Sequence, residues 1–105
     1  MEQPNLSYVH SMSGGDKDFE QKLLKIIKGE FPEEKKIYFD NISAEKYTSC
    51  AANVHKIKHK IGILGLEKSY ALAIAYEQNL LEGKTILRTE FEDILTIMTD
   101  FLNKL

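Results

Sequence analysis

The sequence contains little that would favour a secreted or membrane-bound protein. Of its 105 residues only Cys50 is a cysteine, so no disulfide can form within the chain. It has no charged-then-apolar leader and no apolar run of about 18 residues, the length needed to cross a bilayer. We therefore expect a protein of the reducing cytoplasm that does not insert into a membrane.

An excess of charge of one sign is also lacking. Fourteen Lys and Arg residues face sixteen Asp and Glu residues, which gives a formal net charge of -2 at pH 7. Binding to nucleic acid or to an anionic membrane surface usually needs a marked excess of positive charge. Neither kind of partner is expected.

Breaker residues are few as well, with two prolines and six glycines, and 43% of the residues are hydrophobic. This is the composition of an ordinary folded domain rather than of a disordered chain. The length is enough for one hydrophobic core but too short for a second catalytic domain. We expect a single domain over residues 1–105. We also expect a monomer, because one helical assembly uses up the apolar positions.

Helices are indicated almost everywhere, and strands are not. Apolar residues recur at three- and four-residue spacings, and alternating stretches bounded by turn signals are missing. The pattern predicts an all-α fold, namely an antiparallel four-helix bundle with a short additional N-terminal helix. The short helix is expected over residues 5–12, with Asn5 as its cap, and the turn signal over residues 13–16 separates it from the next helix.

Four long helices should follow this turn. The first reaches a loop near Asp40 and Asn41, and Pro32 should kink it rather than split it. The remaining three are expected from about Ala44 to Ile61, from the segment GILGL to Gly83, and from a Thr85 or Thr89 cap onward. The residues expected to face the core are Leu6, Val9, Met12, Phe19, Leu23, Ile26, Ile27, Phe31, Ile37, Tyr38, Tyr47, Ala51, Val54, Ile57, Ile61, Leu66, Tyr70, Ala73, Ile74, Leu80, Leu87, Phe91, Ile94, Leu95, Met98, Phe101 and Leu102.

The third long helix carries the candidate chemistry on a strip beside its buried stripe. His55 lies near the middle of this strip, its neighbours one turn away are mostly small or short, and Lys56 and Lys60 point elsewhere. A neutral imidazole can attack an electrophile such as an acyl phosphate, and Lys58, one turn on, could compensate phosphoryl charge. The whole strip consists of Thr48, Ala51, Ala52, His55, Lys58, His59 and Gly62.

The string HKIKHKIGILG in this region resembles the signature of histidine phosphotransfer (HPt) domains. The matching positions are His55, Ile57, Lys58, Gly65 and the pair Tyr76-Glu77. The opening LSYVHSMSGGDKDFEQKLL and the proline in the following helix are also usual in that family, so the resemblance spans nearly the whole chain. His59 departs from the pattern, because it stands where HPt domains most often have a glycine that lets the partner approach. It could lie aside, donate a hydrogen bond to the phosphoryl oxygens, or select a receiver whose surface leaves room for an imidazole.

The resemblance implies a role for each of two residues. His55 would be the phosphoacceptor, and Lys58 would help to hold the phosphoryl group. The implied partners are response-regulator receiver domains and a hybrid histidine kinase. The receiver would supply both the phospho-aspartate and a magnesium ion, so no cofactor, nucleotide or autokinase activity of its own is expected. The docking rim around the acceptor would consist of Ala51, Ala52, His59 and Gly62.

Three alternatives compete with this interpretation. His55 and His59 are four residues apart and could chelate zinc with His10, but Lys56 stands where the zinc-protease motif has its glutamate. A dimeric histidine kinase core also presents a bundle histidine, although an acidic residue normally follows it and Lys56 does so here. The third alternative is a helical scaffold that docks receiver or kinase domains without transfer, and the sequence alone does not exclude it.

Two further positions are expected to serve the structure. Glu77 would support a lysine or the connection near Gly65, and Gly62 and Gly65 would allow the helix end and the tight turn. Cys50 is expected to be a small core residue rather than a nucleophile.

Overall fold

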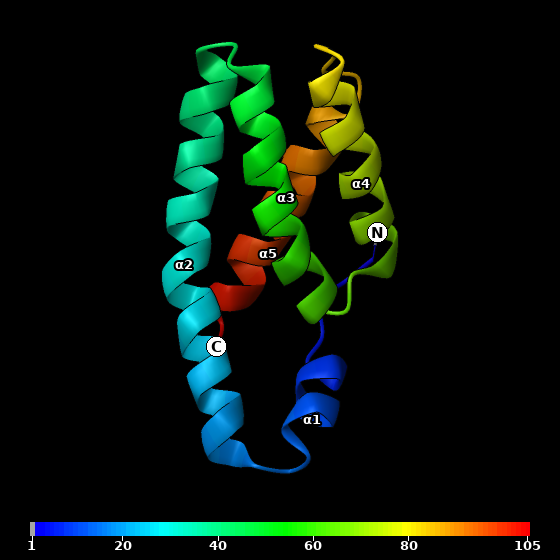
Figure 1. The fold of residues 1–105 in the computed structure, drawn as a ribbon. Coiled ribbons are helices and arrows are strands. Elements are labelled where there is room, and N and C mark those ends of the chain that lie inside the picture. Colours follow the sequence, from blue (N-terminus) through cyan, green and yellow to red (C-terminus); the bar gives the residue numbers. More distant parts are fainter. Residues whose placement is uncertain (1) are drawn as a thin grey trace.

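The computed structural model describes residues 2–105, and this part of the chain consists of five helices without any strand (Figure 1). They are α1 (Ser7–Ser13), α2 (Lys17–Ser43), α3 (Tyr47–Ile63), α4 (Glu67–Leu81) and α5 (Arg88–Asn103). The predicted all-α class is confirmed. No helix within residues 2–105 is long and apolar enough to cross a membrane.

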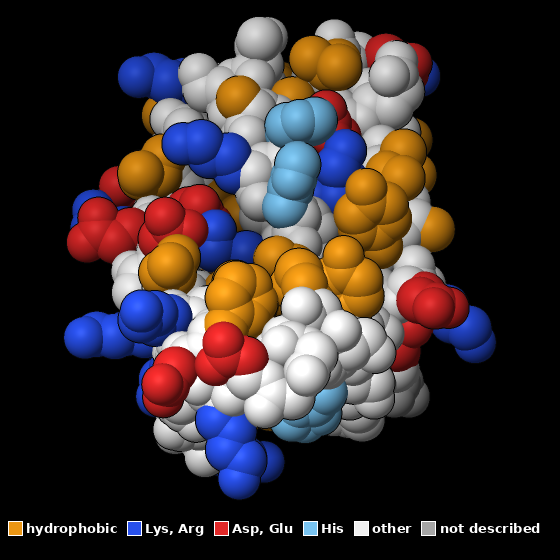
Figure 2. Space-filling model, turned by 60° about the horizontal axis from the view of Figure 1, so that its bottom comes forward, with side chains coloured by type: hydrophobic (Ala, Val, Ile, Leu, Met, Phe, Trp, Pro, Cys, Tyr) orange, Lys and Arg blue, Asp and Glu red, His pale blue; other side chains and the backbone are white. Residues whose placement is uncertain are grey.

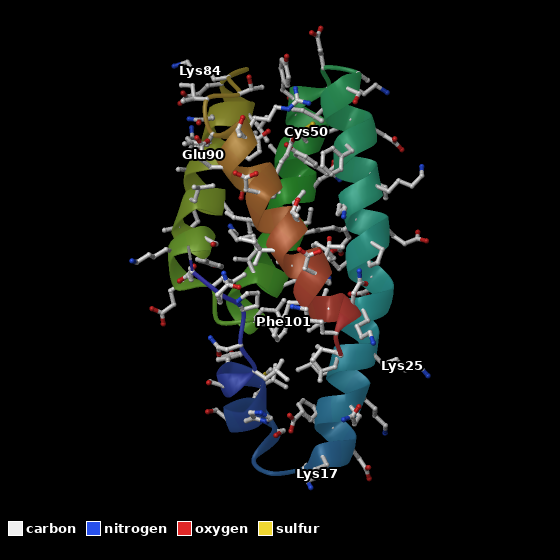
Figure 3. All side chains as sticks on the ribbon, turned by 180° about the vertical axis from the view of Figure 1, so that it is seen from behind. Lys17, Lys25, Cys50, Lys84, Glu90 and Phe101 are labelled. Carbon is white, nitrogen blue, oxygen red and sulfur yellow. The ribbon has the colours of Figure 1, made fainter. Side chains whose placement is uncertain are left out.

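The long helices pack lengthwise, with α3 between α2 and α4 (Figure 1). From behind, α5 runs obliquely across these helices and ends beside α2, with Phe101 near that end (Figure 3). The first part of α2 extends beyond the others, and α1 packs beside it. The side of α3 opposite α5 therefore stays open to solvent.

The helix α2 begins and continues for identifiable reasons. Asp16, the last residue of the predicted turn, caps it, because its Oδ1 accepts the backbone N–H groups of Asp18 and Phe19 at 3.0 and 3.1 Å. Pro32 is exposed and lies inside one continuous helix, which confirms a single helix rather than two.

The predicted loop near Asp40 and Asn41 is wrong, since α2 continues to Ser43. Two contacts hold this last turn in place. Ile42 is buried, and the side chain of Asn41 donates to Oδ1 of Asn53 on α3 at 2.7 Å. Tertiary contacts thus override the local turn signal of the sequence.

The predicted caps of two other helices fare differently. Asn5 accepts the N–H of Ser7 at 3.0 Å at the start of α1, although Leu6 is the residue that directly precedes the helix. Neither Thr85 nor Thr89 caps α5, because Leu87 occupies the cap position and makes no side-chain bond there.

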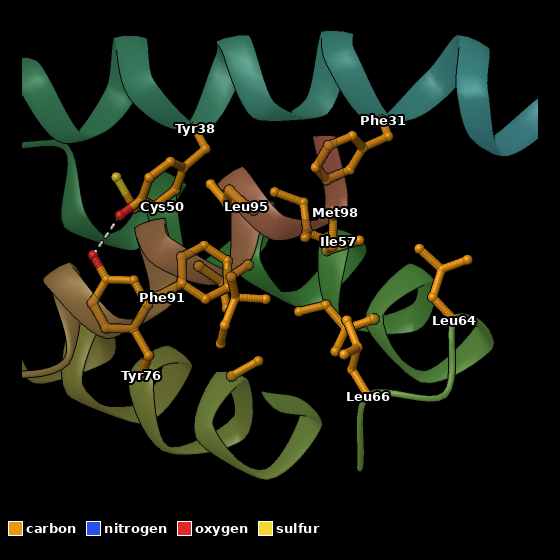
Figure 4. Close-up of a cluster of buried hydrophobic side chains, with 14 of the residues drawn as sticks. Phe31, Tyr38, Cys50, Ile57, Leu64, Leu66, Tyr76, Phe91, Leu95 and Met98 are labelled. Carbon is orange, nitrogen blue, oxygen red and sulfur yellow. Dashed lines mark hydrogen bonds between the residues drawn. The ribbon is translucent and has the colours of Figure 1, made fainter. Parts of the chain in front are cut away.

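The hydrophobic core lies between α2, α3, α4 and α5 and contains most of the predicted residues (Figure 4). Towards one end of the core the hydroxyls of Tyr38 and Tyr76 are 2.7 Å apart, and Tyr38 donates to Glu92 at 3.0 Å. Burial, followed by the bond to Tyr76, raises the pKa of Tyr38 far above the usual value. Cys50 is fully buried beside this pair, as expected of a core cysteine.

Six apolar residues predicted for the core are exposed instead. The three- and four-residue spacing that marks a buried stripe also fits a stripe next to it, so spacing alone cannot fix the rotation of a helix. In α4 the buried stripe contains Ser69, Ala73, Tyr76 and Leu80. The six exposed residues are Met12, Phe19, Ile26, Ile37, Tyr70 and Ile74.

The turn between α3 and α4 is held by the N-terminal segment. Gly65 has a φ of +76°, and the side chain of Asn5 packs so closely that an added Cβ at Gly65 would lie 2.6 Å from it. The Asn5 N–H donates to the Leu64 carbonyl at 2.8 Å. Glu2 then caps α4 by accepting the N–H groups of Lys68 and Ser69, both at 2.9 Å.

These bonds change the acidity of the Glu2 side chain. Burial acts to raise the pKa of Glu2, but the hydrogen bonds from Lys68 and Ser69 outweigh it, so the pKa lies below its usual value. The carboxylate thus acts as a helix cap supplied from a distant part of the sequence.

Lys60 joins α2 to α3. Its side chain is only 10% exposed, and Nζ lies 3.0 Å from carboxylate oxygens of both Glu30 and Glu34. Burial acts to lower the pKa of Lys60, but the bonds to Glu34 and Glu30 outweigh it and raise the pKa. The lysine therefore stays charged and pins α3 against α2.

We predict that Glu45→Gly stabilises the protein. Glu45 has a φ of +58°, a left-handed conformation that ends α2 and that costs a non-glycine residue about 1 kcal/mol. The free energy of unfolding, measured in urea, should rise by about 0.5–1 kcal/mol. The matched control is Glu33→Gly on the exposed part of α2, which should lower it by about 1 kcal/mol. Destabilisation by both variants would contradict the assigned turn.

We predict that Lys60→Ala lowers the free energy of unfolding by about 1–3 kcal/mol, because Glu34 loses its partner in a half-buried position. Since the pKa of Lys60 is raised in the fold, its contribution is fully present below the ordinary lysine pKa and is lost only as the pH rises through the raised value. Urea unfolding at pH 7 and pH 9 should thus show the same deficit. If Lys60→Ala were no less stable than the wild type at pH 9, Lys60 and Glu34 would not be ionised as described.

Candidate functional site

His55 projects from the middle of α3 on the open side of the molecule. Val54 and Ile57, which flank His55 in the sequence, are fully buried, and they set the rotation of α3. The imidazole of His55 therefore faces outward. Its side chain is 56% exposed. The predicted position of His55 on a solvent-accessible strip agrees with this geometry.

Glu77 of α4 faces the Nδ1 edge of the His55 ring. Its two carboxylate oxygens lie 3.2 and 3.3 Å from Nδ1. One of these oxygens also accepts from Nζ of Lys58 at 3.2 Å. A single carboxylate thus connects the histidine and the lysine across the contact between α3 and α4.

These contacts determine which nitrogen of His55 is free. An ionised carboxylate can only accept, so Nδ1 must carry the proton that it donates to Glu77. Nζ of Lys58 lies 3.4 Å from the same Nδ1, but that nitrogen then has no lone pair to offer, and Lys58 donates to Glu77 instead. The neutral ring therefore presents the unprotonated Nε2 as its nucleophilic atom.

Lys58 is held more firmly than the sequence suggests. Its side chain is only 13% exposed, and Nζ lies 5.9 Å from the centroid of the Tyr70 ring as well as beside Glu77. The predicted place of Lys58 beside His55 agrees with this geometry, but its ammonium is paired with Glu77 rather than free. Lys58 approaches Nδ1 of the imidazole, whereas Nε2 is the other ring nitrogen, separated from Nδ1 by Cε1.

His59 lies beside His55, one helical turn further along α3. The two ring centroids are 5.3 Å apart, with the edge of one ring towards the face of the other. Figure 2 shows two pale-blue histidine side chains next to each other in the upper middle of this face, with Lys or Arg side chains on both sides and a group of hydrophobic side chains beyond one of them. His59 is exposed, in agreement with its predicted place on the strip.

An open hollow of about 500 Å³ adjoins His59. Gly62 forms part of it, and an added Cβ at this position would lie 3.3 Å from the ring of Tyr70, so a glycine allows α3 and α4 to approach here. The hollow is lined by Tyr8, His59, Gly62, Ile63, Glu67 and Tyr70. Three helices thus meet on the side of His59 away from His55.

A second open hollow of about 500 Å³ lies on the other side of His55. Ala52 is exposed there, as a docking rim requires, but Ala51 is only 3% exposed and packs in the core. Ala51 therefore offers little surface to the predicted rim, because the strip and the buried stripe overlap at this position. The hollow is lined by Thr48, Ala51, Ala52, His55, Lys56, Glu77 and Leu81.

The described residues offer no assembled metal site. Within residues 2–105 no group of three or more His, Cys, Asp and Glu side chains is placed to hold a metal ion. His10, the third ligand of the zinc alternative, lies on α1 and pairs with Glu20 of α2. The two histidines of α3 therefore stand without this third partner.

Sequence reasoning missed the direct role of Glu77. It assigned Glu77 to structural support of a lysine, which the bond to Lys58 bears out, but not to the orientation of His55. The sequence did contain one indication of this role. Glu77 follows Tyr76, which is fully buried, so Glu77 must lie at the border between the buried and exposed faces of α4. Which residue of α3 its carboxylate then contacts depends on the rotation of α4 relative to α3.

Comparison with protein-family models gave no match, and comparisons with curated proteins and with solved structures gave none either.

We predict that Glu77→Leu changes the tautomer of His55. Without an acceptor at Nδ1, the neutral ring should populate the form protonated at Nε2, which ¹⁵N chemical shifts of labelled histidine distinguish. Glu77→Gln keeps an acceptor oxygen and should fall between the wild type and Glu77→Leu. Glu82→Leu, at the end of the same helix, should leave the His55 signals unchanged. Identical signals in Glu77→Leu and the wild type would exclude an orienting role for Glu77.

Proposed function

We propose that this chain is a histidine phosphotransfer protein, in which His55 accepts a phosphoryl group from the phospho-aspartate of one receiver domain and passes it to another. In this proposal the four long helices form an antiparallel four-helix bundle, with α1 as an added helix. The main support is a single observation. His55 is exposed, its Nδ1 is held by Glu77, and Nε2 is therefore left as a free nucleophile.

The proposed reaction requires no proton transfer. The lone pair on Nε2 attacks the phosphorus atom, the P–N bond forms as the P–O bond breaks, and the receiver aspartate leaves as a carboxylate. The imidazole ring becomes positively charged, with its proton still on Nδ1 opposite the Glu77 carboxylate. In the second half, an aspartate of another receiver attacks phosphorus and His55 leaves as a neutral ring.

The division of labour with the partner follows from this chemistry. The chain orients the nucleophile and stabilises the ring charge through Glu77, whereas the receiver provides the acyl phosphate and the magnesium ion that neutralises the phosphoryl oxygens. The chain then needs no cofactor or nucleotide of its own. The docking surface consists of Ala52, His59 and Gly62, with the hollows on both sides of the histidine pair.

We predict that His55→Gln abolishes acceptance of radiolabelled phosphate from phosphorylated receiver domains without loss of the helical fold. The side chain of His55 is exposed and does not belong to the hydrophobic core, so circular dichroism and urea unfolding should change little. Label on the wild type should be labile to acid and stable to alkali, as expected of phosphohistidine. His10→Gln, which removes an exposed histidine of α1, is the matched control and should keep full transfer.

Two outcomes of this experiment would count against the proposal. Label that persists in His55→Gln would place the acceptor elsewhere. A folded wild-type protein that takes no label from a panel of receivers, yet binds them, would favour the scaffold that docks receivers without transfer.

A further inference from the structure

The geometry around His55 poses a question about the phosphorylated state. The lysine expected to hold the phosphoryl group lies 3.4 Å from Nδ1 and donates to Glu77, whereas the phosphoryl group would sit on Nε2. Glu77 itself is an acceptor and would repel phosphoryl oxygens. Once the receiver and its magnesium ion have left, a donor on another side of the ring would stabilise the phosphoryl group.

His59 is placed to supply this donor. It lies four residues after His55 on the same face of α3, its ring is exposed, and the two ring centroids are 5.3 Å apart. A phosphoryl group extends from Nε2 by a P–N bond and a P–O bond, and a hydrogen bond spans roughly a further 2.7–3.2 Å. Rings this close can be bridged by a phosphoryl oxygen on one and an N–H on the other.

The surroundings of His59 leave its ring free to turn. One side borders the open hollow of about 500 Å³, and within residues 2–105 the ring makes no hydrogen bond or ion pair. The titratable groups that face it are His55 on its own helix, Tyr8 from α1, and Glu67 and Tyr70 from α4.

We propose that His59 is a positioning residue that donates a ring N–H hydrogen bond to an oxygen of the phosphoryl group carried on Nε2 of His55. The inference rests on the proposed function for its biological meaning. The hydrogen bond from His59 is expected whenever His55 is phosphorylated, whatever the source of the phosphoryl group. On this account, His59 does more than occupy a site where similar domains have glycine, because it supplies the donor that Lys58 withholds.

The test uses phosphoramidate, a small phosphoryl donor to imidazole nitrogens, on the full ¹⁵N-histidine-labelled chain. After phosphorylation of His55, the ring ¹⁵N signals of His59 should shift, and its N–H proton should become protected from exchange with water. The signals of unmodified His10 on α1 should not respond to phosphorylation of His55. Unchanged His59 signals, phosphorylation of His59 in place of His55, or a His55 that takes no phosphoryl group would each overturn the inference.

The half-life of phosphorylated His55 in variants is a second readout. A purely structural role of His59 would leave this half-life unchanged. His59→Leu should shorten the half-life of phosphorylated His55 about fivefold, the factor that corresponds to one net hydrogen bond of about 1 kcal/mol. His59→Gln retains an N–H donor and should restore most of the half-life, and His10→Leu should have no effect. Equal half-lives in the wild type and His59→Leu would contradict the inference.

The two proposals can fail separately. Receiver domains that transfer no label to a chain whose His59 responds to phosphoramidate would contradict the relay and leave the contact standing. Efficient transfer from receivers combined with an indifferent His59 would contradict only the contact.

Discussion

The close contact between α3 and α4 is the constraint on which the site depends. His55 and Lys58 lie on one helix and Glu77 on the other, so their bonds exist only if the two helices keep their rotation and spacing. Gly62 permits the approach, and the turn at Gly65, clamped by the N-terminal segment, fixes the angle at which α4 departs. Residues with no chemistry thus set the orientation of the imidazole.

Much of the fold could be predicted from the sequence because the signals involved are local. Helix existence follows from apolar spacing, the Asp16 cap from one side chain and two nearby amides, and the end of α4 from Gly83, which has the positive φ that its sequence context suggests. The exposure of His55 is equally local, since the buried neighbours on α3 leave it only one direction.

The remaining features depend on how one helix is rotated against another, and one sequence does not contain that information. Tyr70 and Ile74 have the spacing of core residues, yet Ala73 and Tyr76 take the core face of α4 and leave them outside. The same rotation places Glu77 next to His55, and it allows Glu77 to form an ion pair with Lys58. Ala51 lies where the strip and the core overlap, and only the packed structure decides between them.

The pairing of Lys58 with Glu77 also has an electrostatic consequence. Because the two charges cancel, this pair adds no net charge to the surface beside a neutral His55. In the proposed reaction, a dianionic phosphoryl group on a positively charged ring adds one net negative charge to that surface. Encounter with a partner should therefore depend little on ionic strength while the chain is unloaded and noticeably once it is loaded. Salt would then bias the two halves of the relay differently.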